Sequence, residues 1–134
     1  MKSRETLIRL KRFQVEEKRR RLAQIETMIA EFQRMAADLD REIAAEEQKA
    51  NISDPAHFAY PTYAKAAAQR RDNLRRSATD LEVQLDDAKA ELGEAYEELK
   101  KVEILEDRER AADAAREPGA MHEASLSRQA RPTL

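Results

Sequence analysis

The side chains that could carry out acid–base or metal chemistry in this sequence are its two histidines and its many carboxylates. His57 and His122 lie far apart, and because the chain has no cysteine, no pair of residues has the spacing of a zinc site. Neighbouring carboxylates such as Glu46 and Glu47 would point in different directions on an exposed helix, without the burial that tunes a pKa for catalysis. Two isolated glycines form no phosphate-binding loop. The sequence therefore predicts no catalytic residue, no metal, no cofactor and no enzymatic activity.

The charged side chains are segregated along the chain. Residues 2–21 hold nine basic and three acidic side chains, whereas residues 80–117 hold fourteen acidic and six basic ones. In one interpretation the two blocks face each other in an antiparallel pair of helices, where each exposed ion pair contributes about 0–1 kcal/mol. In the other, Arg19, Arg20 and Arg21 point outward to an acidic protein partner. Nucleic acid is not an expected partner, because the acidic block should neutralise the field of the basic block.

Three of the six Phe and Tyr residues lie close together near the middle of the chain, at Phe58, Tyr60 and Tyr63. They could cover the end of a helix pair and fill the space beside the chain reversal. They could also be exposed anchors for a protein partner, since tyrosine buries a large area at a low entropic cost. The two interpretations are compatible.

Both charged blocks belong to long segments with a helical repeat. In residues 8–50 and 67–102 apolar side chains recur every three and four positions, as they do on the seam of a coiled coil. The consistently apolar seam positions are Ile8, Val15, Leu22, Ile29, Ala36, Ile43 and Ala50 in the first segment and Ala67, Leu74, Leu81, Ala88, Ala95 and Val102 in the second. Near the N-terminus Arg4, Lys11 and Lys18 occupy the alternate seam positions. We therefore expect the seam to weaken toward the N-terminus.

The prolines lie only at positions 55, 61, 118 and 132, so neither segment is interrupted. A short connection can reverse the chain but cannot run back along a long helix, so the helices should be antiparallel. The predicted fold class is all-α, a long two-helix antiparallel coiled-coil hairpin over residues 1–117, with helices at about 3–50 and 63–116 and a turn at about 51–62. Residues 118–134 have no periodicity and are predicted to form a disordered C-terminal tail.

The composition supports this interpretation. Ala, Glu, Lys, Leu and Arg supply 79 of the 134 residues, and 24 of these are alanine, so a thick globular core is not expected. The first residues lead into charged sequence and no run of 18 apolar residues occurs, so we expect neither a signal peptide nor a membrane span. Together with the absence of cysteine, this predicts a soluble cytoplasmic protein.

Residues 9–18, Arg-Leu-Lys-Arg-Phe-Gln-Val-Glu-Glu-Lys, belong to a basic first helix that precedes an aromatic turn and an acidic second helix. Over residues 1 to about 115 this pattern resembles the FliJ family of flagellar type III export proteins, and it is also similar to the stalk proteins of injectisomes. The resemblance consists of heptads and charge. The segment beyond Pro118 has no counterpart in the family.

The resemblance implies an antiparallel coiled coil similar to the central stalk of a rotary ATPase. It implies three partners: a hexameric export ATPase whose pore receives the end formed by both chain termini, the cytoplasmic domain of the membrane export gate, and export chaperones. It also implies a cytoplasmic protein that is peripheral at the inner membrane when assembled. The residues expected at the ATPase are Arg9, Arg12, Arg19, Arg20 and Arg21, and those expected at the gate are Asp38, Arg41, Phe58, Tyr60 and Tyr63.

A generic structural or scaffold coiled coil is the main alternative. The stalk interpretation predicts a mostly monomeric hairpin. A scaffold predicts a homo-oligomer, because polar and small seam residues such as Lys11 and Ala88 leave a thin core that further helices could thicken. A nucleic-acid-binding coiled coil would have an affinity that falls steeply with salt concentration.

Overall fold

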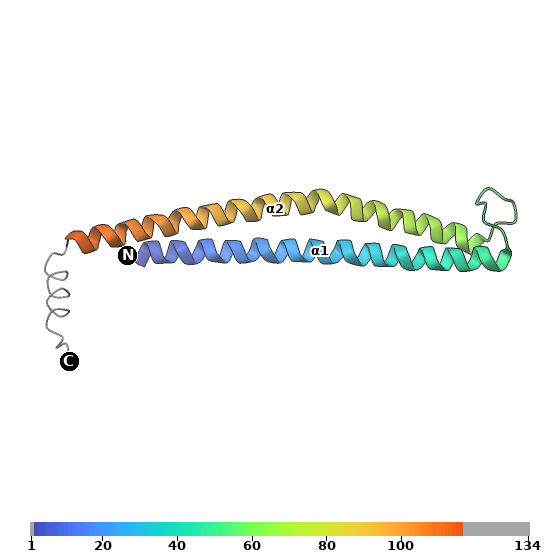
Figure 1. Ribbon diagram of the computed structural model, residues 1–134, viewed down its shortest axis with the longest axis horizontal. Coiled ribbons are helices and arrows are strands. Elements are labelled where there is room, and N and C mark those ends of the chain that lie inside the picture. Colours follow the sequence, from blue (N-terminus) through green and yellow to red (C-terminus); the bar gives the residue numbers. More distant parts are fainter. Residues whose placement is uncertain (1, 117–134) are drawn as a thin grey trace, which may run out of the picture. The chain divides into compact units, whose positions relative to one another are not determined.

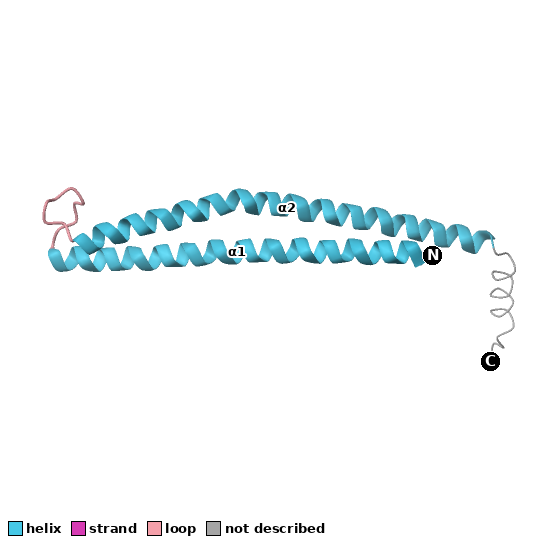
Figure 2. Cartoon of the chain, turned by 180° about the vertical axis from the view of Figure 1, so that it is seen from behind, coloured by secondary structure: helices cyan, strands magenta, loops and turns pink. Residues whose placement is uncertain are grey.

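The computed structural model describes residues 2–116, and this part of the chain contains two α-helices and no strand. Helix α1 is Lys2–Ala50 and helix α2 is Thr62–Arg116. The helices are joined by a loop at residues 51–61 and pack against each other, so the protein is an all-α helical hairpin (Figures 1 and 2). The segment predicted to be a disordered tail, residues 118–134, lies outside the described residues.

The described chain divides into two compact units. Unit 1 combines residues 2–16 of α1 with residues 94–116 of α2. Unit 2 is Glu17–Gly93 and contains the loop. Neither helix, over the residues that the structure describes, has a stretch both long enough and apolar enough to cross a membrane.

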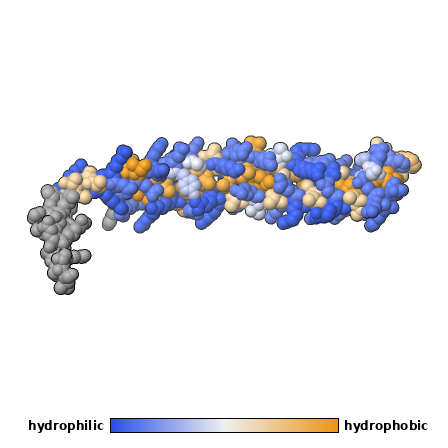
Figure 3. Space-filling view, viewed as in Figure 1, coloured by the Kyte–Doolittle hydropathy of each residue, from blue (hydrophilic) through white to orange (hydrophobic). Residues whose placement is uncertain are grey.

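Burial follows the repeat of the sequence. Every predicted seam position except Ala50 is buried or half-buried in the structure, and most positions between them are exposed. Only one stripe of each helix is therefore covered, as expected for helices that meet along a coiled-coil seam. Hydrophilic side chains cover most of the face seen in Figure 3.

Unit 2 contains two apolar clusters that join α1 to α2. The buried members of the first cluster are Ile25, Ile29, Leu81 and Ala88, with Leu22, Phe32 and Leu85 packed against them. The buried members of the second cluster, next to the loop, are Ile43, Ala64 and Ala67, with Leu39, Tyr60 and Ala68 packed against them. Several of these residues are alanines, which remove little apolar area from water, so the free energy gained at each position is smaller than at a leucine.

Unit 1 has the thinner core. Its buried apolar side chains, among the described residues, are Val15 and Ala95, and a third buried seam position holds Glu106 at 5% exposure. Glu106 Oε1 accepts a hydrogen bond from Arg110 Nε at 3.2 Å, while Oε2 has no hydrogen-bond partner in the described part of the chain. The predicted weakening of the seam toward the N-terminus is confirmed by this burial pattern.

Gly93 lies inside α2 at an exposed position, and a Cβ atom added there would meet nothing within 4 Å. No neighbouring group therefore packs so closely that this position requires a glycine. Because glycine lowers helix stability by about 1 kcal/mol relative to alanine, we predict that Gly93→Ala raises the free energy of unfolding by about 0.5–1 kcal/mol. Urea denaturation followed by far-UV circular dichroism measures this change.

Ala90→Gly is the matched control, because Ala90 is exposed and lies one turn earlier in the same helix. It should lower the free energy of unfolding by a similar amount. A Gly93→Ala protein less stable than the parent would contradict the prediction.

Candidate functional site

In unit 1 the basic side chains of α1 pair with acidic side chains of α2. Lys11 Nζ donates a hydrogen bond to Glu98 Oε2 at 2.8 Å, and Arg4 Nη1 lies 3.0 Å from Glu109 Oε2. The lower-numbered residue of α1 meets the higher-numbered residue of α2, as an antiparallel arrangement requires. Part of the basic cluster is therefore neutralised within the chain, as the intramolecular interpretation predicts.

The same kind of pair occurs in unit 2, where Lys18 Nζ donates to Glu91 Oε2 at 3.1 Å. The hydrogen bond from Lys18, and then its charge, lowers the pKa of Glu91, and Arg21 adds a smaller electrostatic effect. The hydrogen bond and charge of Lys11 lower the pKa of Glu98 in the same way. Both carboxylates thus stay ionised at a pH where an ordinary glutamate is already protonated.

The arginines expected at the ATPase have different surroundings; two lie in unit 1 and three in unit 2. In unit 1, Arg12 Nη2 is 3.8 Å from Glu103 Oε2, and both side chains are well exposed, so this ion pair is weak. Arg9 in unit 1 and Arg20 in unit 2 are exposed and form no ion pair within the described residues. Arg19 is also exposed but has an interaction within the chain.

The loop of unit 2 starts from a well-defined helix end. Asn51 has a φ of 56°, and its N–H donates to the Gln48 carbonyl at 3.3 Å. The N–H of Ile52 donates to the Glu47 carbonyl at 3.2 Å. These two bonds form a Schellman motif, in which a left-handed residue satisfies the last carbonyl groups of a helix. Asparagine adopts this conformation more readily than most residues do.

Several polar groups of the remaining loop bond to one another. Asp54 Oδ1 accepts a hydrogen bond from the Ala56 N–H at 2.9 Å, and His57 Nδ1 accepts one from the Ala59 N–H at 3.0 Å. Backbone bonds of 3.0 Å run from the His57 N–H to the Asp54 carbonyl and from the Tyr60 N–H to the His57 carbonyl. Side chains that accept bonds from nearby backbone groups stabilise turns, so the loop has a defined conformation without a partner.

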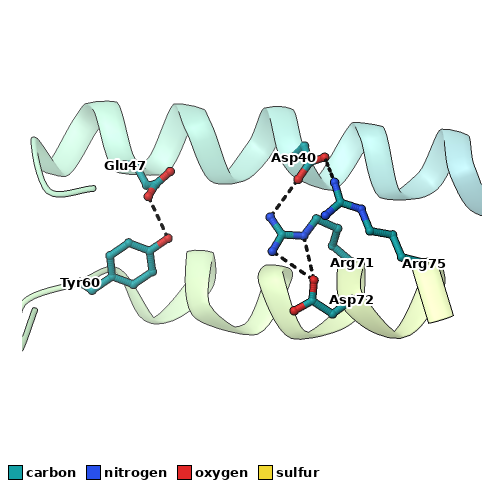
Figure 4. A network of polar contacts seen from close by, with 6 residues as sticks. All are labelled: Asp40, Glu47, Tyr60, Arg71, Asp72 and Arg75. Atoms are coloured by element: carbon teal, nitrogen blue, oxygen red, sulfur yellow. Dashed lines mark hydrogen bonds and ion pairs between the residues drawn. The ribbon is translucent and has the colours of Figure 1, made fainter. Parts of the chain in front are cut away.

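The predicted aromatic surface is divided by this loop. Phe58 is 97% exposed, and its only recorded aromatic neighbour in the described residues is His57, whose ring is stacked on it at 4.7 Å between centroids. Tyr60 turns toward the helices instead, where it packs on the second cluster and its hydroxyl donates to Glu47 Oε2 at 3.2 Å (Figure 4). Burial, and then the hydrogen bond to Glu47, raises the pKa of Tyr60. Phe58 is thus available to a partner, while Tyr60 stabilises the fold.

Tyr63 and the two charged residues expected at the gate lie along one side of unit 2. The Tyr63 hydroxyl donates to Glu42 Oε2 at 2.8 Å, and this bond raises the pKa of Tyr63. Asp38 forms an ion pair with Arg41 on the same helix. Asp38 and Tyr63 line a shallow groove of about 240 Å³, together with Met35, Leu39, Glu42 and Arg70. The structure therefore brings Asp38 and Tyr63 together but leaves Phe58 outside this groove.

Sequence reasoning missed a charged network in unit 2. Asp40 Oδ1 accepts from Arg71 Nη1 at 2.9 Å, and Asp40 Oδ2 accepts from Arg75 Nη2 at 2.6 Å (Figure 4). Arg71 Nε also donates to Asp72 Oδ1 at 3.2 Å. The signal was the position of Arg71, which lies seven residues after Ala64 and seven before Ala78 on the buried stripe of α2. A partly buried guanidinium requires an acceptor, so a carboxylate should lie opposite. The network links α1 to α2 and so helps to fix which residues of the two helices face each other.

The described residues contain no group of three or more side chains that could hold a metal ion, and His122 lies outside them. No protein-family model, no curated protein and no solved structure matches this chain. The charges and the exposed side chains of the chain itself are therefore the basis for proposing a function.

The ion pair between Lys11 and Glu98 gives a prediction for Lys11→Gln. The pKa of Glu98 should rise toward its ordinary value of 4.5. Because the pKa of Glu98 is lowered in the folded protein, the pair stabilises the fold above the unfolded pKa, and this contribution is lost as the pH falls through the lower, folded pKa. Carboxyl ¹³C NMR titration measures the pKa, and urea midpoints against pH measure the stability.

Lys100→Gln is the control for this titration, because Lys100 is exposed and takes no part in lowering the pKa of Glu98. It should leave the Glu98 titration unchanged. The assigned pair is wrong if Lys11→Gln and Lys100→Gln have the same effect on Glu98.

Proposed function

We propose that this protein is a non-enzymatic stalk or escort protein of the flagellar type III export apparatus. It binds a hexameric export ATPase through the basic face of α1 and links that ATPase to the cytoplasmic domain of the export gate and to export chaperones. In the assembled apparatus it is peripheral at the cytoplasmic face of the inner membrane. The proposal joins the family resemblance of the sequence with the surfaces that the hairpin leaves exposed.

One observation carries the proposal. Seam lysines such as Lys11 and Lys18 are already paired with acidic residues of α2, whereas Arg9 and Arg20 are exposed and unpaired within the described residues. Arg9 and Arg20 can therefore bind a partner without breaking an ion pair of the hairpin. An arginine is well suited to an acidic protein surface, because its planar guanidinium can bind a carboxylate through two hydrogen bonds.

The loop supports a second contact. Phe58 is almost fully exposed on a loop with its own hydrogen bonds, and exposed aromatic side chains are frequent anchors of protein interfaces. Asp38 and Tyr63 line a separate groove in the same unit. We assign Phe58 as the anchor for the export gate, with Asp38 and Arg41 as flanking polar contacts.

The physical mechanism is asymmetric contact. Equivalent surfaces of a hexamer are related by symmetry, and a single two-helix hairpin cannot contact all of them equally. Unequal contacts favour different conformational states in different ATPase subunits. A partner bound at the loop could then be coupled to the hydrolysis cycle through a difference in binding free energy.

The ATPase contact is tested by Arg19→Glu, Arg20→Glu and Arg21→Glu in one chain. We predict that this triple reversal abolishes stimulation of the purified hexameric export ATPase, because the acidic partner then meets like charges. The helix content measured by circular dichroism should stay close to that of the parent, because all three side chains are exposed. Steady-state ATP hydrolysis is the measurement.

A chain with Arg34→Glu, Arg76→Glu and Lys89→Glu is the matched control, since it makes the same change in net charge at exposed positions of unit 2. It should retain stimulation. Equal stimulation by both triple variants would remove the proposed ATPase surface.

The gate contact is tested by Phe58→Ser. Truncating an interface anchor typically costs 2 kcal/mol or more, so the affinity for the purified cytoplasmic gate domain should fall about 30-fold. The thermal midpoint should not change, because the Phe58 side chain is 97% exposed. Val83→Ala, at an apolar side chain that is 64% exposed on α2, is the control and should bind like the parent. An unchanged affinity of Phe58→Ser, measured by calorimetry, would rule out Phe58 as the anchor.

A further inference from the structure

Unit 1 exposes more large apolar side chains than its core contains. Its buried apolar residues are Val15 and Ala95 among those described. Its exposed large apolar residues, each at 40–55% exposure, are Leu7, Leu10, Phe13, Tyr96, Ile104 and Leu105. A helix pair with a thin core and an apolar exterior is typical of a protein that packs against further helices.

A groove along α2 is one place where another helix could pack. It has a volume of about 530 Å³ and is lined by Tyr96, Leu99, Lys100, Glu103, Ile104 and Asp107. These residues recur every three and four positions, so they lie along one side of the helix. The groove thus combines apolar side chains with two carboxylates and one lysine ammonium group, so its net charge is negative.

The other helix of unit 1 carries matching chemistry. Leu10 and Phe13 are exposed on α1, and Arg9 lies four residues before Phe13, on the same side of the helix. Residues 2–16 carry five basic and two acidic side chains, whereas residues 94–116 carry eight acidic and five basic ones. An α1 segment from a second copy of this chain therefore complements the α2 groove in both charge and apolar character.

The ion pairs inside unit 1 leave a complementary pair of charges unused. Neither Arg9 nor Asp107 forms an ion pair within the described part of the chain. Arg9 is one turn from Arg12, and Asp107 is one turn from Glu103. Because Arg12 and Glu103 meet at 3.8 Å, Arg9 and Asp107 lie on the same side of unit 1 and at neighbouring levels along it.

We infer that this side of unit 1 is a self-association surface, where α1 of one copy packs on the α2 groove of a second copy and α2 of the first packs on α1 of the second. A two-fold axis makes both contacts equivalent, so Arg9 of each copy pairs with Asp107 of the other. Phe13 then lies beside Tyr96 and Ile104, which removes apolar area from water at both contacts.

This inference does not depend on the proposed ATPase contact. The stalk interpretation predicts a mostly monomeric hairpin, and self-association of the free chain departs from that expectation, while ATPase binding needs only one copy at the hexamer. The two are linked in one respect: Arg9 and Arg12 lie at both surfaces, so a bound ATPase and a second copy would compete for unit 1. Weaker ATPase stimulation at concentrations where the chain is dimeric is therefore expected from this competition. Loss of stimulation at concentrations where the chain is monomeric would count against the proposed function and not against the dimer.

The test is sedimentation equilibrium of the full chain over about 1–100 µM, a range that detects dissociation constants near the micromolar level. The parent chain should approach the mass of a dimer. Arg9→Glu and Asp107→Lys should each weaken the dimer by about tenfold or more, because each dimer contains two such pairs and each change sets like charges opposite one another. The chain with both changes should have a dimer dissociation constant within about threefold of that of the parent, because each pair is restored with reversed charges.

Arg34→Glu is the control, since it alters an exposed arginine of unit 2 and should leave the dimer unchanged. Phe13→Ala should weaken the dimer independently of charge. A parent chain that stays monomeric over the whole range would overturn the inference. So would a chain with both charge changes that associates no better than either single variant, because the two residues then do not face each other.

Discussion

The structure depends on a seam that is only one stripe wide on each helix. The seam residues of each helix are covered by the other helix, and most of the remaining residues are exposed to water. Because many seam residues are alanines, the apolar area removed from water at each step along the helices is small. Polar contacts across the seam, such as those of Lys11 and Lys18, therefore contribute to which residues face each other. They contribute less to the free energy of folding, because exposed ion pairs are weak.

Most of this arrangement could be predicted from the sequence, because a coiled coil is a local pattern repeated along the chain. The seven-residue spacing identifies the buried positions, and the segregated charges identify an antiparallel register that Lys11 and Glu98 satisfy. Ala50 departs from the pattern since it is the last residue of α1, where no partner covers it. A local repeat does not describe how a helix ends.

The candidate surfaces were harder to predict, because exposure depends on geometry between neighbouring residues. The sequence groups Phe58, Tyr60 and Tyr63 within six positions, but the loop and the start of α2 direct them into three surroundings. The bridge from Asp40 to Arg71 was missed for a related reason. A charged residue at a seam position indicates that a partner exists, but the pattern does not identify which of several nearby carboxylates it is.

The self-contained loop has a consequence for the speed of binding. Several of its backbone N–H groups bond to Asp54, to His57 and to the end of α1, so the loop is held in place before an encounter at Phe58. A ligand that meets a preformed surface loses less conformational entropy than one that must organise a flexible segment. Association at Phe58 would then be limited by diffusion and orientation instead of by a folding step. Such a contact can form and dissociate many times while the helices behind it stay unchanged.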